Sequence, residues 1–311
     1  SLPYLMKNDR ENAEAAFNRY FANALALKII EDNPLIEKFY KEWRDTDHSY
    51  SQLSLNDALK SVDLSETPWL KDALGEEENL KKMAELFDRD NIKSELRSAV
   101  RNLREMQYQN GSFPWYGGGK PNFYISQYIL EGILRLEELG ITDFEQSIKS
   151  SLYRYCASEI MEISKRDDQY LGLPLIKNVW INSRMGEKVD GSYLRLVTKA
   201  KNQFKGNWFD YGLLEQIYIA KIFENEDEQL VNEILSSLFQ KSFYKEQLGR
   251  FWSNNPGGVY SSWDIDLQAS MISLFDKFPE HKANVDDMKF WLITNKRTNS
   301  WSSNIATSSA M

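Results

Sequence analysis

Cysteine and histidine are scarce in this chain of 311 residues. Cys156 is the only cysteine, and His48 and His281 are the only histidines. One cysteine excludes an internal disulfide, although it does not fix the compartment. Neither histidine lies near the cysteine or near the other histidine in sequence, so we expect both on the surface. The sequence therefore predicts no metal site and no other cofactor.

Long hydrophobic runs and basic segments are also missing. No run approaches the ~18–20 apolar residues that span a bilayer, and the N-terminus lacks the basic and apolar regions of a signal peptide. Acidic residues outnumber basic ones by 46 to 38, which gives a net charge of −8. An acidic surface is poorly suited to a phosphate backbone. We expect no nucleic-acid partner and no membrane contact by this domain itself.

Alternating Val-, Ile- and Thr-rich runs are rare, which predicts little or no sheet. Apolar residues instead recur at helical spacing along nearly the whole chain. Asn8 and Asp9 are suitable N-cap residues for the first helix, and Asn33-Pro34 is a typical helix restart. We expect helices at about 7–27, 34–43, 51–62, 65–69, 75–88, 91–107, 122–139, 143–164, 171–185, 192–203, 211–223, 226–243 and 264–278.

A glycine- or asparagine-rich turn followed by an aromatic residue and a helix recurs along the chain. It occurs near Trp115, Trp208 and Tyr260 and, in a weaker copy, at Trp301. No Gly-Lys-Ser or Gly-Lys-Thr follows these turns, so we expect no phosphate-binding loop. Outer helix, turn, inward aromatic and inner helix form a repeating unit. We predict an all-α fold and one α/α toroid over residues 1–311, with an open helical superhelix as the alternative.

Several segments resemble the thioester domain of the bacterial alpha-2-macroglobulin family, in which Cys-x-Glu-Gln lies on the first turn of a helix. Matching residues near the N-terminus are Leu2-Pro3-Tyr4-Leu5-Met6, Glu14, Phe17, Arg19, Tyr20, Ala22, Asn23, Leu25 and Ala26. Further matches are Phe113-Pro114-Trp115-Tyr116, Tyr124–Ile129, Asp264–Ala269 and Met288–Trp301. The resemblance runs nearly from end to end and is weakest over 143–249.

This resemblance implies a terpenoid-cyclase-like α/α toroid that is a thioester-type domain of a longer chain. The C-terminal residues 305–311 look like a helix just beginning, which also suggests a piece of a longer protein. The resemblance further implies an extracytoplasmic location, in the periplasm or at the cell surface. The implied partners are the other domains of the parent chain. If the parent protein is a protease inhibitor, as the resemblance implies, proteases are partners as well.

The two reactive positions of the family motif are replaced in this sequence. Asn12 stands where the family has Cys, and Ala15 stands where it has Gln. A thioester needs a thiolate at the first position and a glutamine carboxamide at the second. Asn12 has no thiol, and Ala15 has no carboxamide. Glu14 remains, either as a former neighbour of the thioester or, as we favour, as an ordinary acid at a helix N-terminus. We therefore expect a non-enzymatic domain that acts without covalent capture.

A carbohydrate-active enzyme is the alternative prediction. Acids on an inner helix beside an aromatic cleft resemble the carboxylate pair of inverting glycoside hydrolases. Asp264 and Asp266 are the candidate acids, and Asp210 or Glu215 is a candidate partner. The candidate cleft or inner-ring aromatics are Trp115, Tyr124, Trp252 and Trp263. The competing explanation is that the two acids only satisfy free N–H groups at a helix start.

Overall fold

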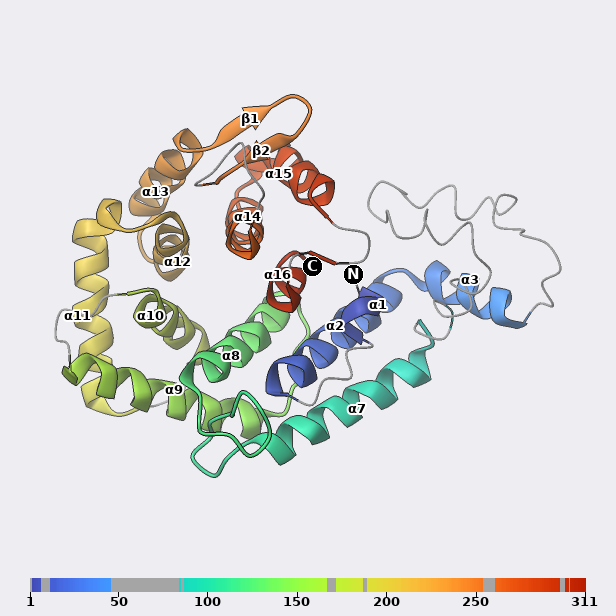
Figure 1. Cartoon of the computed structure of the whole chain (residues 1–311). Coiled ribbons are helices and arrows are strands. Elements are labelled where there is room, and N and C mark those ends of the chain that lie inside the picture. The colour runs from blue at the N-terminus through green and yellow to red at the C-terminus, as the bar shows by residue number, and fades with distance from the viewer. Residues whose placement is uncertain are drawn as a thin grey trace.

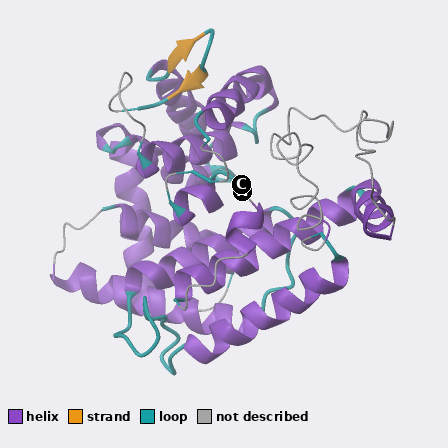
Figure 2. Cartoon of the chain, turned by 45° about the vertical axis from the view of Figure 1, so that its right-hand side comes forward, coloured by secondary structure: helices purple, strands orange, loops and turns teal. Residues whose placement is uncertain are grey.

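The computed structural model describes residues 2–6, 12–45, 84, 87–166, 172–186, 189–253, 261–296, 300–301 and 303–311. These residues are helical apart from turns and one short hairpin, so the predicted all-α class is confirmed (Figure 2). The helices predicted between 51 and 83, His48 and the turn at 257–260 lie outside the described residues.

The α-helices within the described ranges are α1 (Leu2–Met6), α2 (Ala13–Asp32), α3 (Pro34–Asp45), α7 (Arg89–Met106), α8 (Phe123–Glu138), α9 (Gln146–Arg166), α10 (Leu173–Met185), α11 (Gly191–Asn207), α12 (Leu213–Phe223), α13 (Glu228–Gln240), α14 (Ser262–Phe275), α15 (Lys282–Thr294) and α16 (Asn304–Ser309). Two 3-10 turns, η2 (Trp208–Asp210) and η3 (Pro279–His281), precede α12 and α15. Strands β1 (Phe243–Lys245) and β2 (Gly249–Phe251) pair antiparallel, with Phe243 opposite Phe251.

Six of the helices pack against one another in a closed order. Helix α2 contacts α8, and the contacts continue through α10, α12, α14 and α16 back to α2 (Figure 1). Helices α7, α9, α11, α13 and α15 lie outside these six. The main core lies between the two sets of helices and includes the buried side chains of Phe113, Tyr153 and Trp180. This closed order is consistent with the predicted α/α toroid. The all-α class is confirmed, and the toroid stays a prediction.

A ring of alternating charges joins the ends of four inner helices. Arg184, near the end of α10, donates to Glu138 at the end of α8 at 3.3 Å and also to Glu224, which follows α12. Lys277, just after α14, lies 2.8 Å from Glu224 and 3.5 Å from Glu138. The C-terminal ends of α8, α10, α12 and α14 therefore meet at one end of the ring, and these four helices run in the same direction.

The start of the first long helix was predicted wrongly. Helix α2 begins at Ala13, after an N-cap at Asn12 whose backbone is extended. Asn12 forms an isolated bridge with Tyr116, and the Ala13 N–H donates to the Trp115 carbonyl at 3.3 Å. Because this contact with a distant loop fixes the helix start, local N-cap preferences at Asn8 and Asp9 did not decide it.

Most other predicted boundaries agree with the structure within a few residues. The helix predicted over 122–139 is α8, and Asn122 is its N-cap, since the Asn122 side chain accepts a hydrogen bond from the Ile125 N–H at 3.0 Å. The helix predicted over 226–243 ends at Gln240, and the chain then forms the hairpin. In the turn before α8, Phe113 is the fully buried aromatic, while Trp115 is half-buried.

Candidate functional site

A cavity of about 190 Å³ lies inside the ring of inner helices. All six ring helices contribute side chains to its lining. These include Phe17 and Phe21 of α2, Tyr124, Gln127, Tyr128, Glu131 and Arg135 of α8, Leu173 and Lys177 of α10, Leu214 of α12, Trp263 and Asp266 of α14, and Ile305, Ser308 and Ser309 of α16.

The cavity opens at the N-terminal ends of four parallel helices. Tyr124, Leu214 and Trp263 each occupy the second position of their helix, and Leu173 begins α10. Along α8 the lining residues follow the three- and four-residue spacing of one helix face, from Tyr124 to Arg135. The charge ring described above lies at the C-terminal ends of the same helices. The cavity therefore lies toward the N-terminal ends of these helices, and the four ion-pair residues at the other end do not line it.

A buried ion network forms the floor of the cavity. The Glu131 carboxylate is almost completely buried and accepts hydrogen bonds from Arg135 at 2.7 Å and from Lys177 at 2.9 Å. The hydroxyl of Tyr218, a fully buried residue of α12, also donates to Glu131. Buried charges are tolerated when they are paired in this way. The network joins α8, α10 and α12 beneath the cavity.

The pKa values of the network follow from these contacts. Burial opposes ionisation of Glu131, but Lys177, Arg135 and the Tyr218 hydroxyl outweigh it and lower the pKa of this carboxyl from 4.5 to about 2. Burial alone would lower the pKa of Lys177, and the Glu131 charge reverses this and raises it. The lowered pKa favours the ionised form of Glu131, which does not suit the role of a general acid.

Helix α16 is attached to the cavity wall by two hydrogen-bonded chains. The Ser309 hydroxyl donates to Asp266 at 2.7 Å and accepts from Arg135 at 3.3 Å. The Tyr128 hydroxyl donates to Asn18 of α2 at 2.6 Å and shares a hydrogen bond of 2.8 Å with Ser308. These bonds hold the short C-terminal helix between α14 and α2.

The degenerate motif lies beside this cavity, at the start of α2. Asn12 Oδ1 accepts a hydrogen bond from the Ala15 N–H at 2.7 Å, and both residues are buried. Glu14 is half-buried and has interaction partners. Burial raises the pKa of the Tyr124 hydroxyl, Lys177 opposes the rise, and the charges of Asp266, Glu131 and Glu14 add to it. Glu14 therefore belongs to the same electrostatic environment as the cavity mouth.

The predicted cleft residues divide into two groups. Tyr124, Trp263 and Asp266 line the cavity, and Trp115 stacks on Tyr124 with ring centroids 6.1 Å apart. Trp252 is fully buried, where its indole N–H donates to the Leu238 carbonyl at 2.8 Å. Trp252 therefore belongs to the core of the fold and does not line the cavity.

The predicted acids are likewise separated. The Asp264 carboxylate accepts from the Ser261 N–H and hydroxyl, both at 2.7 Å, in a capping box at the start of α14. This is the helix-start role that competed with the enzymatic one. Asp210 is exposed in η2 and Glu215 is half-buried in α12, and neither lines the cavity. The only predicted acid brought to the cavity is Asp266.

Glu131, Arg135, Lys177 and Tyr218 are not among the residues predicted from the sequence. Two of them left a signal, because Glu131 interrupts an apolar helix face and Arg135 follows it four residues later. An acid inside an apolar stripe requires a buried partner. Lys177 and Tyr218 come from other helices, so their pairing with Glu131 depends on the tertiary fold.

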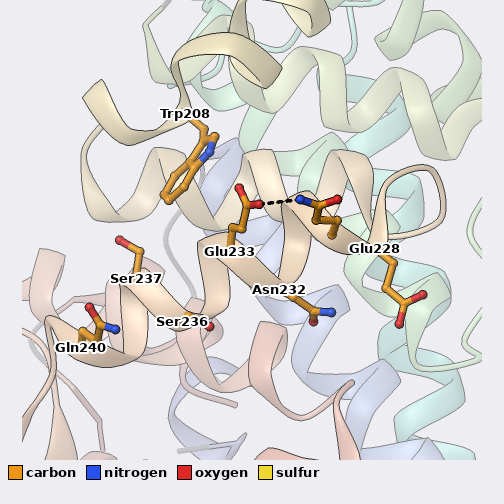
Figure 3. Close-up of a pocket in the computed structure, with 8 residues that line it drawn as sticks. Trp208, Glu228, Asn232, Glu233, Ser236, Ser237 and Gln240 are labelled. Carbon is orange, nitrogen blue, oxygen red and sulfur yellow. Dashed lines mark hydrogen bonds between the residues drawn. The ribbon is translucent and has the colours of Figure 1, made fainter.

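A second hollow lies on the outer helix α13, beside Trp208 (Figure 3). It is open to solvent and lined by Trp208 and polar residues of α13, such as Asn232 and Ser236. Gln229 donates to Glu233 within it at 3.0 Å. One helix supplies nearly all of its lining, so it lacks the converging groups of a binding site.

His281 lies in η3, half-buried against Phe275 with ring centroids 4.9 Å apart. Among the described residues, no three His, Cys, Asp or Glu side chains gather closely enough to hold a metal ion. None of the helices in the described ranges combines the length and apolarity needed to cross a membrane.

The described residues thus form a mainly helical fold with a charged cavity lined by six helices. No protein-family model matches the chain, and no curated protein sequence matches it. Among solved structures, it is similar to native alpha-2-macroglobulin from Escherichia coli, in a crystal structure spanning domain MG7 to the C-terminus. The TM-score is 0.46 and the identity 13%, over 88% of this chain and 40% of that one. A likeness this weak says nothing about function, and the chain spans less than half of that structure.

Proposed function

We propose that this chain is a thioester-type domain without a thioester, within a longer extracytoplasmic protein of the alpha-2-macroglobulin type. In this proposal the domain acts non-covalently, by supporting neighbouring domains or by helping to entrap a protease. The sequence resemblance motivates it. The observation that supports it is the hydrogen bond from the Ala15 N–H to Asn12 Oδ1, because the sequence resemblance assigns these two residues to the reactive positions of the motif.

The chemistry at the start of α2 supports a non-covalent role. Asn12 has no sulfur and Ala15 has no carboxamide, so no acyl link joins the two side chains. The only thiol, Cys156, is fully buried in α9, and burial raises its pKa well above the usual range. A thiol in this state is a poor nucleophile. The hydrogen bond at Asn12 instead stabilises the helix start.

Methylamine tests the absence of a thioester directly, since it opens an acyl-sulfur bond and remains attached. The native protein is incubated with methylamine, and its intact mass is compared with that of an untreated sample and of a sample treated after unfolding. We expect three identical masses. A methylamine adduct that forms only on the native protein would contradict the proposal.

Entrapment is tested on the parent protein incubated with trypsin. Trapping blocks cleavage of a large protein substrate and spares a small peptide amide, because only the small substrate reaches the enclosed protease. We expect the protease to separate from the parent chain on a denaturing gel. A protease that stays attached after denaturation rejects the non-covalent mechanism. Unchanged cleavage of both substrates rejects entrapment and favours the supporting role.

The geometry gives less support to an inverting glycoside hydrolase. That reaction needs a protonated carboxylic acid and a second carboxylate on the two sides of the scissile bond. Glu131 and Asp266 both line the cavity, but Glu131 is held ionised by Arg135 and Lys177. Asp264 is committed to its capping box. Release of reducing sugar from a polysaccharide by the purified chain would restore the enzymatic alternative.

A further inference from the structure

We propose that the central cavity binds an uncharged, polyhydroxylated ligand the size of one sugar ring, without converting it. This inference does not rest on the proposed function, because it uses the cavity rather than the start of α2. It comes from three properties of the cavity: an aromatic rim, a fixed polar floor and a balanced charge.

The rim presents two partly exposed aromatic rings. Tyr124 is 57% exposed and Trp263 is 38% exposed, although both also line the cavity. Tyr124 stacks nearly parallel on Trp115, with an angle of 7° between the rings, so its orientation is fixed. Flat aromatic faces of this kind attract the weakly positive C–H groups of a sugar ring. Exposure of these aromatic rings to water is also unfavourable, and a ligand stacked on them would cover this surface.

The floor offers donors and acceptors held in position by the network. The Lys177 ammonium has three N–H groups, of which one donates to Glu131 at 2.9 Å. Asp266 Oδ1 accepts from Ser309, and a carboxylate has further acceptor sites on both oxygens. The Gln127 amide nitrogen donates to the Pro174 carbonyl at 2.8 Å, which fixes the orientation of its amide group. Few, well-oriented polar groups among apolar walls are typical of small-molecule sites.

The charge of the lining favours a neutral ligand. Glu131 and Asp266 are balanced by Arg135 and Lys177. Glu131 pairs directly with both cations, and Asp266 is joined to Arg135 through the Ser309 hydroxyl. The positive helix ends around the mouth are also partly offset, because α2, α12 and α14 each carry an acid in the first turn, at Glu14, Glu215 and Asp264. A charged ligand would gain no net attraction and would lose its hydration.

The volume sets the size of the ligand. Drug-sized ligands occupy pockets of roughly 300–1,000 Å³, whereas this cavity measures about 190 Å³. One sugar ring suits this space, and an oligosaccharide does not. Helix α16 forms part of the wall through Ile305, Ser308 and Ser309, so a bound ligand would add contacts that hold this short helix in place.

The first experiment uses the native chain and four probes. D-glucose and N-acetyl-D-glucosamine are neutral, D-glucuronate is anionic and D-glucosamine is cationic. Saturation-transfer difference NMR measures binding, and hydrogen exchange locates it. We expect saturable binding of at least one neutral sugar, weaker binding of both charged probes, slower exchange in residues 304–309 and unchanged sugar signals over time. Absent binding of both neutral probes, tighter binding of a charged probe, or unchanged exchange in α16 overturns the proposal.

Matched variants then test the rim. Tyr124→Ala and Trp263→Ala are each expected to weaken binding by about tenfold through the loss of one stacking face. Tyr244→Ala removes a tyrosine of similar exposure, 54%, from β1 outside the cavity, and should leave affinity unchanged. Asp266→Asn keeps the shape of the floor and should weaken binding several-fold. Equal effects of all four variants would reject the site, and the methylamine result would be unaffected.

Discussion

The side chain of Asn12 accepts a hydrogen bond from the backbone N–H of Ala15, with 2.7 Å between Oδ1 and N. An N-cap residue satisfies one of the free donors at a helix start in this way. In this chain the bond joins the two positions at which the sequence resemblance expects reactive groups. The start of α2 therefore has a structural role that can be measured.

The first prediction concerns this cap. Asn12→Ala removes the acceptor and should lower the free energy of unfolding by about 1 kcal/mol. Asn12→Ser keeps a side-chain oxygen suited to capping and should stay within a few tenths of a kcal/mol, roughly, of the native protein. Urea unfolding followed by circular dichroism measures both. Equal stability of the two variants would show that the bond does not stabilise the fold.

A larger loss is expected at the buried ion network. Glu131→Gln leaves the charges of Lys177 and Arg135 without their carboxylate, and should lower the free energy of unfolding by roughly 3–5 kcal/mol. The comparison variant is Glu162→Gln, which breaks the exposed pair with Lys165 and should have little effect because solvent screens it. A small loss for Glu131→Gln would mean that the network contributes no net stability.

The Glu131 carboxyl should also make the stability of the protein depend on pH. Folding lowers the pKa of Glu131 from 4.5 to about 2, so its contribution to stability is complete above pH 4.5 and is lost as the pH falls through 2. The native protein should therefore become less stable over this acid range. The stability of Glu131→Gln should vary less with pH over the same range. Parallel curves from urea unfolding at several pH values would argue against this assignment.

Two glycines of one loop allow the cost of backbone strain to be measured separately from the cost of steric overlap. Gly111 and Gly118 both have positive φ, at 88° and 75°. A Cβ at Gly111 would overlap the Ser151 carbonyl of α9, whereas nothing lies near one at Gly118. Gly118→Ala should cost about 1–2 kcal/mol through its φ angle alone. Gly111→Ala should cost roughly 1–3 kcal/mol more, which thermal unfolding of the pair would reveal.

The last prediction concerns the single thiol. Cys156 is fully buried, and burial raises its pKa. Ellman's reagent should therefore label the native protein only as fast as it unfolds, and should label one thiol per chain at once in denaturant. Cys156→Ser provides the blank. Rapid labelling of the native protein would show that the thiol is accessible, and would reopen the question of a reactive nucleophile.

Much of the fold could be read from local patterns. Helical spacing in the apolar residues placed α8 within a few residues, and Asn33-Pro34 did the same for the start of α3. These features depend on neighbours in sequence, so the sequence contains them. The start of α2 was misplaced because Asn12 forms a bridge with Tyr116 and the Ala13 N–H donates to the Trp115 carbonyl, about a hundred residues away. The hairpin was missed because its strands are three residues each.

The candidate site was only partly predictable. The sequence predicts Asp266, Tyr124 and Trp263 as cleft or inner-ring residues, and all three line one cavity. Trp252 and Asp264 are of the same residue types, yet one is buried in the core and the other caps a helix. Residue type alone does not distinguish these roles, because burial and hydrogen-bond partners are set by packing.

The sequence by itself determined the helical class, because this class follows from local periodicity. It also determined that position 12 has no thiol and position 15 no carboxamide, because these are properties of single residues. Only the tertiary structure brought Glu131, Arg135, Lys177 and Tyr218 together from three helices and placed α16 against them. Ion pairs and cavities depend on distances of a few ångströms between segments far apart in the chain. Those distances exist only after the helices have packed.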